Sequence, residues 1–434
     1  MKQLITKVIL SLIGIIKLGL CYQIYWANLH SHTALSDGQG TPSEAFLYAR
    51  DTAQIDILAI TDHTHYLNQA TYQYLRAVAD SFTEDGRFIA IAGQEFGSLS
   101  AFGHFSMFEA ESLCPVSTYD LERTYQWIAN YQVPTQFNHP QAGNFDDLLF
   151  NRNGDRYVSA IEVVNGSGNY TPYYEEQYLK ALNQGWHIGP VANQDNHRRR
   201  WGNATTTQGQ IPLTGIWSDT LTKQAILDAI NHSRIYACEI KPANDKILLT
   251  EFSVNDKIMG DICYTTDKNV TIKLTVEAIN KFAKILLYKN GIITDSITAD
   301  TNQLQWIVQD TITNGYYFIK GIQQDGDRFW TTPIWVNYNP ALSSGTVVAW
   351  PHPIKNRSVI KFPREVNGGS EMFIYNLEGK LVYQEQKDYN QEHYWDGTDQ
   401  NGKVLDDGIY LVVIKVNNAQ QQKIYKGKIA LLRQ

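Results

Sequence analysis

Short runs of apolar and β-forming residues recur along the first half of the chain, and each one adjoins a polar cluster. The runs and the polar residues that follow them are Gln23–Ala27 with Asn28–His32, Ile55–Ile60 with Thr61-Asp62-His63, Phe88–Ala92 with Gly93-Gln94-Glu95, Val133–Phe137 with Asn138-His139-Pro140, Ala160–Val164 with Asn165, and Trp186–Ala192 with Asn193–His197. A further run, Phe105–Phe108, is preceded by Gly103-His104. Apolar runs of this length predict strands buried on both faces of a sheet.

Helical segments separate most of these strands. The first begins at Thr41-Pro42-Ser43-Glu44 and extends to about Gln54, because Thr is a good N-cap, Pro suits the first helical position and Glu closes a capping box. The other predicted helices are Leu121–Tyr131, Tyr173–Gln184 and Thr222–Asn231. This alternation predicts a β/α barrel with its polar clusters at the carboxyl rim of the strands. An open doubly wound sheet is the alternative, but it gathers ligands from six or seven strands less readily.

The pattern changes after about Lys241, where short strands and turns replace the alternation. The predicted strands are Ile247–Val254, Val270–Ala278, Ile285–Lys289, Leu304–Val308, Tyr316–Ile322 and Ile334–Val336. They predict a β-sandwich over residues 244–340. A second small all-β unit is expected over residues 341–434. There, Met372–Tyr375 pairs with Lys380–Tyr383 across a turn, and Ile409–Val416 adds another strand.

The first 21 residues resemble a signal peptide. Lys2 and Lys7 supply positive charge, Val8–Leu20 is mostly apolar, and Gly19 and Cys21 supply the small residues of a cleavage site. A transmembrane anchor is disfavoured because Lys17 interrupts the apolar run, which falls short of the roughly 20 residues that a span needs. A lipoprotein attached through Cys21 is a further alternative, although the preceding Leu is large for that processing site.

Length and composition narrow the class of protein. A chain of 434 residues is long enough for two or three domains with cores of their own. The net charge is −7 with both signs mixed, so a nucleic-acid partner is not indicated. Cleavage after Cys21 leaves Cys114, Cys238 and Cys263, which permit one disulfide but no disulfide framework.

The polar clusters at the predicted rim contain imidazoles and carboxylates. We expect nine metal ligands: His30, His32, Asp37, His63, Glu95, His104, His139, Asp195 and His197. A set without thiols suits Zn, Mn or Fe and argues against a cysteine-type structural zinc site. Nine ligands are too many for one ion, so we expect two or three ions that share Glu95. Adjacent ions lower the pKa of a water between them and so generate a hydroxide nucleophile.

Arg198-Arg199-Arg200 directly follows two of these ligands. Guanidinium groups beside a metal cluster suit an anionic phosphoryl group, whereas the simpler interpretation is a solvated basic loop. We expect catalysis to depend on Glu95, His63, Asp195 and Arg198: a hydroxide attacks phosphorus, and the ions and an arginine stabilise the charge that develops. A water on the ions or a histidine then protonates the leaving alcohol.

Other polar residues near the rim have plainer interpretations. Asp62 is expected to orient an imidazole or cap a turn, and His65 to lie on the rim without binding an ion. Glu162 and Asn165 are open between contact with substrate and a role in the local structure. His187 and His232 are expected to be structural.

Five separated motifs, taken together, resemble a known family. His30-Ser31-His32-Thr33 with Ser36-Asp37-Gly38, Ile60–His63, Glu95, Asn138-His139-Pro140 and Asp195-Asn196-His197 occur in the order typical of the polymerase-and-histidinol-phosphatase (PHP) metallophosphoesterases, and are most similar to the CehA/McbA-like metallohydrolases. The resemblance covers residues 22–240 and implies a distorted seven-stranded β/α barrel with a trinuclear site. One ion is then held by His30, His32, Glu95 and Asp195, a second by Asp37, His63 and His197, and a third by Glu95, His104 and His139. Asp37 stands where many relatives have His.

The C-terminal unit resembles a second family. Trp350–Pro353, Ile374–Val382, Trp395–Lys403, Asp407–Tyr410 and Tyr425–Ile429 are similar to the C-terminal sorting domain of Bacteroidetes type IX secretion, with His352 in place of the usual Asn. Asp399–Gly402 has some features of a calcium loop, but the later acidic ligand is missing and a turn is favoured. The resemblance implies that this unit is an export signal.

The sequence therefore predicts a signal peptide (1–21), a PHP-like hydrolase barrel (22–243), an Ig-like β-sandwich (244–340) and a β-sandwich sorting domain (341–434). The expected function is hydrolysis of phosphate mono- or diesters by an exported enzyme of a Gram-negative bacterium. Its partners would be a phosphorylated small-molecule or polymer substrate and the secretion machinery, with no transmembrane span in the mature chain. The alternatives are a metal-dependent hydrolase of carbamates, amides or carboxylic esters, and a non-catalytic cell-surface binding protein.

Overall fold

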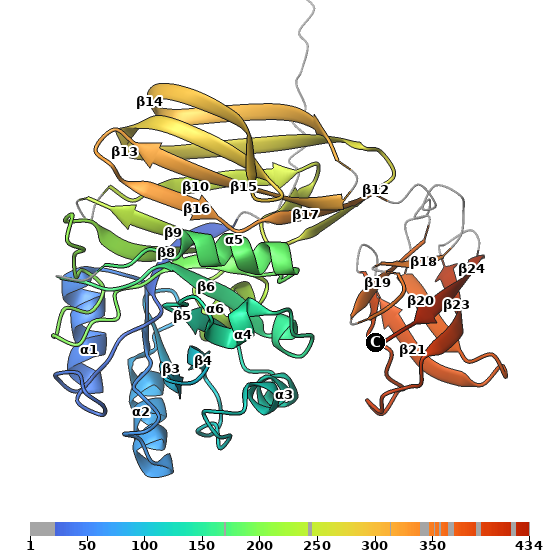
Figure 1. The fold of residues 1–434 in the computed structure, drawn as a ribbon, viewed down its shortest axis with the longest axis horizontal. Coiled ribbons are helices and arrows are strands. Elements are labelled where there is room, and N and C mark those ends of the chain that lie inside the picture. The colour runs from blue at the N-terminus through green and yellow to red at the C-terminus, as the bar shows by residue number, and fades with distance from the viewer. Residues whose placement is uncertain are drawn as a thin grey trace, which may run out of the picture.

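The structure is a computed structural model. It describes residues 22–168, 171–241, 245–312, 314–338, 347–350, 352–355, 357–362, 369–387, 392–417 and 422–433. The predicted signal peptide lies outside these residues. Three parts are visible in Figure 1: a mixed α/β part, a layer of long strands stacked on it, and a small β-domain beside them.

Seven neighbouring strands form the centre of the α/β part. They are β1 (Gln23–Asn28), β2 (Ile57–Ile60), β3 (Ile89–Ser98), β4 (Gly103–Phe108), β5 (Thr135–Asn138), β6 (Val158–Val164) and β7 (Gly189–Ala192). Each pairs with the next, in parallel except for the two antiparallel steps on either side of β4. The row of strands returns to its start, because the backbone of Asn196 after β7 bridges that of Ser31 after β1.

The direction of β4 departs from the uniform alternation that the sequence predicts. A parallel crossover needs a dozen or more residues, whereas only residues 99–102 connect β3 to β4. This short connection forces a hairpin. At Gly97, which has φ +131°, a side chain would collide with the backbone of Gly103 on the facing strand, so the hairpin requires glycine there.

Helices cover the outside of these strands. They are α1 (Pro42–Tyr48), α2 (Gln69–Phe82), α3 (Leu121–Tyr131), α4 (Asn144–Leu148), α5 (Glu175–Gln184) and α6 (Lys223–Asn231). The capping box predicted for α1 is present, with the side chain of Thr41 accepting from Glu44 N and that of Glu44 accepting from Thr41 N. A π-helical turn extends α1 to Ala53, and Gln54 ends it with φ +55°. The short α4 contains three residues with left-handed φ, Phe145, Asp146 and Asp147.

Two more strands, β8 (Ile211–Ser218) and β9 (Ile235–Ile240), connect the α/β part to the layer of long strands. β8 pairs with β1 and β9, and β9 in turn pairs with β16. The layer consists of β10 (Leu248–Val254), β11 (Lys257–Ile258), β12 (Ile262–Thr265), β13 (Asn269–Lys289), β14 (Ile292–Thr311), β15 (Asn314–Gln323), β16 (Arg328–Thr331) and β17 (Ile334–Tyr338). The β9–β16 ladder thus crosses the boundary expected at residues 243–244.

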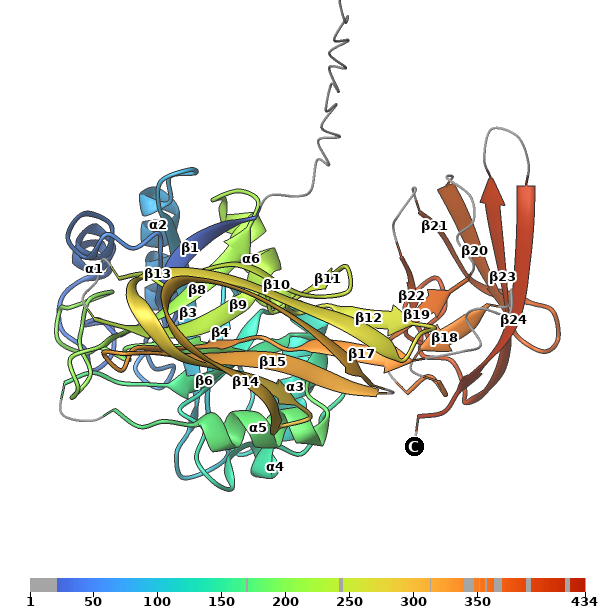
Figure 2. The same cartoon turned by 90° about the horizontal axis from the view of Figure 1, so that it is seen from above.

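One strand replaces two in this layer. The predicted strands Val270–Ala278 and Ile285–Lys289 are both parts of β13, whose register shifts between Glu277 and Phe282. Such an irregularity interrupts the alternation of apolar residues while the strand continues, so the sequence pattern resembles a break. Figure 2, which is seen from above, shows β13, β14 and β15 crossing in front of the α/β part.

The C-terminal domain consists of two small sheets. One contains β18 (Val348–Trp350), β19 (Ser358–Lys361) and β22 (His393–Trp395), and the other contains β20 (Gly369–Tyr375), β21 (Leu381–Lys387), β23 (Gly408–Asn417) and β24 (Gln422–Leu431). The hairpin of β20 and β21 pairs Ile374 with Tyr383, as the sequence predicts. Met372, Trp395 and Ile414 lie in the core of the domain.

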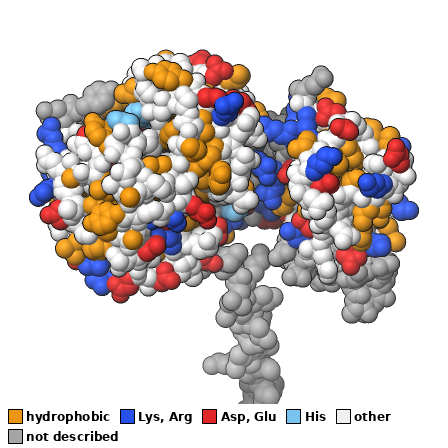
Figure 3. Space-filling view, turned by 90° about the horizontal axis from the view of Figure 1, so that it is seen from below, with side chains coloured by type: hydrophobic (Ala, Val, Ile, Leu, Met, Phe, Trp, Pro, Cys, Tyr) orange, Lys and Arg blue, Asp and Glu red, His pale blue; other side chains and the backbone are white. Residues whose placement is uncertain are grey.

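The C-terminal domain contacts both other parts. Arg156 Nη2 lies 3.5 Å from Asp396 Oδ2, and Lys361 Nζ lies 4.3 Å from the centre of the Tyr264 ring. Figure 3 shows Lys and Arg side chains gathered along the groove between the domain and the larger body.

The cysteines and helices settle two further points. Cys114, Cys238 and Cys263 are all free and buried, so the disulfide that the sequence permits is absent from the described residues. Burial raises the pKa of the Cys114 thiol to about 12 and that of Cys263 to about 11. Among the described residues, every helix is too short or too polar to cross a membrane.

Candidate metal centre

The structure brings all nine predicted ligands together at one end of the central strands. Most of them follow strands: His30 and His32 come after β1, His63 after β2, His139 after β5, and Asp195 and His197 after β7. Glu95 lies inside β3 and Asp37 on the loop after β1. His104 is the second residue of β4, and it reaches the same end because β4 runs antiparallel to its neighbours.

The first group of side chains is almost fully buried. His30 Nε2 lies 3.2 Å from Glu95 Oε1 and 3.5 Å from Asp195 Oδ1. His32 Nε2 lies 3.3 Å from Glu95 Oε2 and 3.0 Å from Asp195 Oδ1. These are the four residues that the family resemblance assigns to one ion. Asp195 Oδ1 is thus approached by two imidazole nitrogens, as expected of an oxygen that is positioned for a shared cation.

The second group lies nearer the solvent and is looser. Asp37 Oδ1 lies 3.3 Å from His197 Nε2, 3.8 Å from His63 Nε2 and 4.0 Å from His32 Nδ1. The Asp37 side chain is 42% exposed, whereas that of His32 is fully buried. Asp37 therefore carries the most accessible carboxylate of the cluster.

Glu95 connects the first group to the third. Its Oε1 lies 3.1 Å from His104 Nδ1 and 3.0 Å from His139 Nε2, in addition to its contact with His30. Its Oε2 faces His32 and also lies 3.0 Å from His63 Nδ1. Five imidazoles thus surround one buried carboxylate, and each of its oxygens serves a different set.

Charges within the cluster stabilise one another strongly. Burial disfavours the carboxylate of Glu95, but the surrounding imidazoles outweigh that effect and hold its pKa well below the usual range. Burial likewise disfavours a charged His32, yet Asp195 and Glu95 raise its pKa to about 10. Protons on the imidazoles would balance these carboxylates where no cation is bound, and a cation that binds would displace them.

Glu162 supports the cluster from behind, a role that the sequence left open. It is fully buried, and its Oε1 accepts from His30 Nδ1 at 2.9 Å, which directs Nε2 of that ring towards Glu95. Its Oε2 accepts from the backbone of His139 and from Asn165 Nδ2. Glu162 therefore orients His30 and His139, and Asn165 orients Glu162, whereas contact with substrate stays a prediction for both residues. The sequence offers one signal for this role: Glu162 is a carboxylate within the apolar strand Ala160–Val164, and buried charges are normally paired.

Asp62 shapes the loop that carries Asp37. It accepts hydrogen bonds from the backbone and hydroxyl of Thr33, at 2.8 and 2.6 Å, and from the hydroxyl of Ser36. Its role is therefore to cap this turn, and it makes no hydrogen bond to an imidazole in the described residues. Asn138 Nδ2 donates to Glu95 Oε1 at 2.9 Å and so fixes the shared carboxylate.

Backbone strain coincides with two of the ligands. His139 has φ +29° and Asp195 has φ +45°, a region that costs non-glycine residues energy. The surrounding hydrogen bonds hold both: Glu162 accepts from His139 N, and Asp195 N donates to His30 O at 3.1 Å.

The three arginines separate into two kinds. Arg198 and Arg200 line a hollow of about 520 Å³ together with Asp195 and His197. Arg199 lies outside that lining, and its Nη2 is 3.9 Å from Glu44 Oε2. The guanidinium of Arg198 has no hydrogen bond or ion pair to any described residue, whereas Arg200 Nη2 donates to Asn203 O.

The remaining histidines lie outside the ligand groups. His65 is exposed, with its ring centre 5.1 Å from that of His63, which agrees with a rim position. His187 pairs with Asp155, and His232 Nδ1 lies 2.7 Å from Asp228 O, as expected of structural residues.

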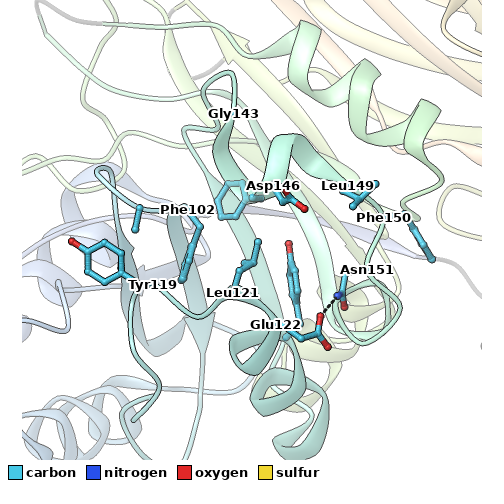
Figure 4. A pocket seen from close by; sticks show the side chains of 12 residues that line it. Phe102, Tyr119, Leu121, Glu122, Gly143, Asp146, Leu149, Phe150 and Asn151 are labelled. Carbon is cyan, nitrogen blue, oxygen red and sulfur yellow. Dashed lines mark hydrogen bonds between the residues drawn. The ribbon is translucent and has the colours of Figure 1, made fainter.

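A second hollow, of about 560 Å³, lies beside the strand that carries His104. The residues that line it include the aromatic side chains of Phe102, Tyr119 and Phe150 (Figure 4). Two other lining residues, Glu122 and Asn151, are joined by a hydrogen bond that the Glu122 carboxylate accepts. None of the nine predicted ligands lines this hollow, so it is separate from the cluster.

The site is thus a cluster of histidines and carboxylates, of the kind that holds several divalent ions, on a mixed α/β scaffold. Residues 355–431 match the CHU_C type IX secretion signal domain, which confirms the sorting domain predicted from the C-terminal motifs. This domain supports export to the cell surface or the medium and implies interaction with the secretion machinery.

Comparisons with the rest of the chain give distant similarities. An uncharacterized protein of Chlamydia muridarum is 20% identical over 363 residues, which cover 73% of this chain, and one of Chlamydia trachomatis is 20% identical over 364 residues. The chain spans only 58% of the length of these curated relatives. A crystal structure from Bacteroides vulgatus, of a two-domain protein containing a predicted PHP-like metal-dependent phosphoesterase, is 16% identical. It covers 72% of this chain and 95% of its own, with a TM-score of 0.42.

Proposed function

We propose that this chain is an exported, metal-dependent phosphoesterase that hydrolyses phosphate mono- or diesters. The observation that carries the proposal is the position of Glu95, whose two oxygens lie within 3.3 Å of five imidazoles. A carboxylate shared in this way suits neighbouring cations, because each of its oxygens can serve a different ion.

The donor set fits divalent ions such as Zn, Mn or Fe. In the assignment that the family resemblance implies, one ion would be held by His30, His32, Glu95 and Asp195, a second by Asp37, His63 and His197, and a third by Glu95, His104 and His139. The absence of thiols from the cluster agrees with this assignment. When bound, such ions polarise a phosphoryl oxygen and lower the pKa of water towards neutrality.

The chain's own residues supply binding and orientation. Glu162 fixes the ring of His30, and Asn138 fixes Glu95, so that neither ligand has to reorganise during the reaction. Arg198 and Arg200 border the hollow beside Asp195, where guanidinium groups would attract an anionic phosphoryl group. His63 has a side chain that is 15% exposed, and its two ring nitrogens face Glu95 and Asp37, so its role in the proposal is to hold the second ion.

The two arginines favour this proposal over its nearest alternative. Carbamates, amides and carboxylic esters can be hydrolysed with the same ions, but those substrates carry no charge that needs guanidinium groups. A non-catalytic binding protein is disfavoured because all nine ligands are present together with the buried residues that orient them.

A parallel assay tests the proposal. The purified full chain, reconstituted with Zn, Mn or Fe(II), is offered aryl phosphate monoesters, aryl phosphate diesters and aryl carboxylic esters of matched leaving group. We expect metal-dependent release from a phosphate ester, and we expect Asp195→Asn to abolish it. The exposed Asp219, remote from the cluster in sequence, provides the matched control Asp219→Asn, which should behave as wild type. Release from the carboxylic ester alone would contradict the assignment to phosphate.

Counting the ions tests the finer part of the proposal. Elemental analysis after reconstitution, with anomalous scattering at the metal edges, should give three occupied positions. Two positions at saturating metal, with His104 and His139 both free, would reduce the site to a binuclear one.

A further inference from the structure

A second cluster of acidic side chains lies at the junction between the α/β part and the layer of long strands. Asp245 precedes β10, and Asp325 and Asp327 lie on the turn between β15 and β16. One oxygen from each of the three carboxylates lies within 4.8 Å of the others. Asp245 and Asp327 are 1% and 0% exposed, whereas Asp325 reaches the solvent.

Neutral donors surround these carboxylates. Asp245 Oδ1 accepts from the backbone of Ile279, and Asn280 Nδ2 donates to both Asp245 Oδ2 and Asp325 Oδ2. Asp327 Oδ2 accepts from the backbone of Lys241. These hydrogen bonds orient the oxygens but do not balance three negative charges.

Cationic side chains do not balance the cluster either. No side-chain nitrogen of a described Lys, Arg or His lies within 4.0 Å of an oxygen of these three carboxylates. Lys241 comes nearest, but its Nζ donates to the backbone oxygen of Asp325. Burial, together with the neighbouring carboxylates of Asp325 and Asp245, raises the pKa of Asp327 to about 7, as expected where negative charge lacks a balancing cation.

An independent feature points to a cation. Asp327 Oδ1 is fully buried and has no hydrogen-bond partner, although the other oxygen of the same carboxylate is bound. Gln323 Oε1 is also buried without a partner, and the amide nitrogen of this side chain lies 3.4 Å from Asp245 Oδ2. Buried oxygens of folded proteins are almost always satisfied, so the unpartnered oxygen of Asp327 requires an explanation.

We propose that Asp245, Asp325 and Asp327 bind a Ca²⁺ ion at this junction. The donors are all oxygens, which favours a hard cation over Zn or Fe, and Ca²⁺ tolerates the irregular geometry of donors from a loop and a turn better than Mg²⁺ does. The ion neutralises the carboxylates and satisfies Asp327 Oδ1. It also ties Asp245, at the start of the long-strand layer, to the turn that precedes β16.

The proposed ion reinforces the connection between two parts of the molecule. β16 pairs with β9 of the α/β part, and Lys241 directly after β9 donates to Asp327. An ion on the β15–β16 turn therefore fixes the strand through which the long-strand layer is hydrogen-bonded to the catalytic part. Extracellular proteins commonly use calcium in this way, with dissociation constants of about 10⁻⁴–10⁻³ M.

Equilibrium dialysis of the full chain against radiolabelled Ca²⁺ tests the proposal, with the catalytic cluster first loaded with Zn. We expect one Ca²⁺ per chain with a dissociation constant of about 10⁻⁴–10⁻³ M. Asp325→Asn, at an exposed position, should weaken binding at least tenfold. Asp300→Asn is the matched control, because Asp300 is also exposed but pairs with Lys281 outside the cluster. Calcium should raise the melting temperature of wild type and of Asp300→Asn but not that of Asp325→Asn.

Two further measurements make the result decisive. Asp195→Asn should retain the calcium site, and loss of calcium binding in that variant would place the ion in the catalytic cluster and overturn the proposal. Absence of binding at about 5 mM Ca²⁺, or equal binding by wild type and Asp325→Asn, would also overturn it. If Asp325→Asn fails to fold, an anomalous peak between the three carboxylates of the wild-type protein decides the question.

Discussion

Replacing Glu162 by Gln separates a residue that orients a ligand from one that binds the ion. The Glu162 carboxylate only accepts hydrogen bonds: Oε1 from His30 Nδ1 and Asn193 Nδ2, and Oε2 from His139 N and Asn165 Nδ2. A glutamine offers one acceptor oxygen, and its amide group would face two of these donors. The shape of the side chain is retained, so the change removes hydrogen bonds without creating a cavity.

The magnitude follows from the number of donors that lose their partner. Two buried donors left unsatisfied cost about 1–3 kcal/mol each, so Glu162→Gln should lower the free energy of unfolding by about 2–6 kcal/mol. Loss of the partner that orients a metal-binding imidazole weakens metal affinity by about 10–100-fold. We therefore expect the variant to need 10–100-fold more metal for half-maximal activity, while most of the activity returns at saturating metal.

Metal titration of activity, with unfolding followed by circular dichroism in the metal-free state, measures both effects. Glu122→Gln is the matched control, since Glu122 is exposed on α3 and outside the cluster. Wild-type metal affinity in Glu162→Gln would refute the orienting role. A stable variant that binds metal normally but stays inactive at every metal concentration would instead place Glu162 in contact with the reacting groups.

Three other changes test separate parts of the proposal. Arg198→Ala should raise KM for a phosphate ester at least tenfold, whereas Arg199→Ala, whose side chain faces Glu44, should leave both kcat and KM unchanged. The metal-free protein should lose stability between about pH 6.5 and pH 10, as measured by denaturant unfolding. The reason is that the pKa of His32 is raised to about 10 in the folded protein, so the stability that its charged form contributes is complete below the pKa of the unfolded chain and is lost as the pH rises towards 10. The metal-loaded protein should lack this loss, since imidazoles that hold a metal carry no proton to release. Removal of the chain from residue 341 should preserve hydrolysis but abolish surface display, scored by cell fractionation.

The residues proposed as ligands could be picked out from the sequence because most of them belong to a short local motif. His30 and His32 alternate along a strand end, and Asp195 and His197 do the same after β7, so neither pair requires knowledge of the tertiary structure. Helix boundaries were equally local: α3 begins and ends at the predicted residues. Their assembly into one cluster follows from the rule that parallel strands deliver their carboxyl ends to one rim, except for His104, which lies at the start of the antiparallel strand β4.

The remaining features depend on contacts between residues far apart in the chain. Glu162 lies 132 positions from His30, and no local pattern announces that pairing. The inward and outward arginines alternate within three residues, and the left-handed backbone of Arg199, with φ +56°, contributes to that difference. The apolar pattern predicts two strands where the structure has the single strand β13. A shift in register and a true break produce the same interruption in that pattern.

The β3–β4 hairpin connects the least predictable part of the fold to the centre of the site. β3 contributes Glu95 and β4 contributes His104, and the two strands pair so that Gly97 stands opposite His104. A parallel β4 would carry His104 at the opposite end of the central strands, and Glu95 would then lack one of its five imidazoles. The third group of ligands therefore depends on the short connection between the two strands and on a glycine at position 97, where any side chain would push β4 away. A sequence pattern of apolar runs records neither strand direction nor this close approach, although both determine whether His104 can reach Glu95.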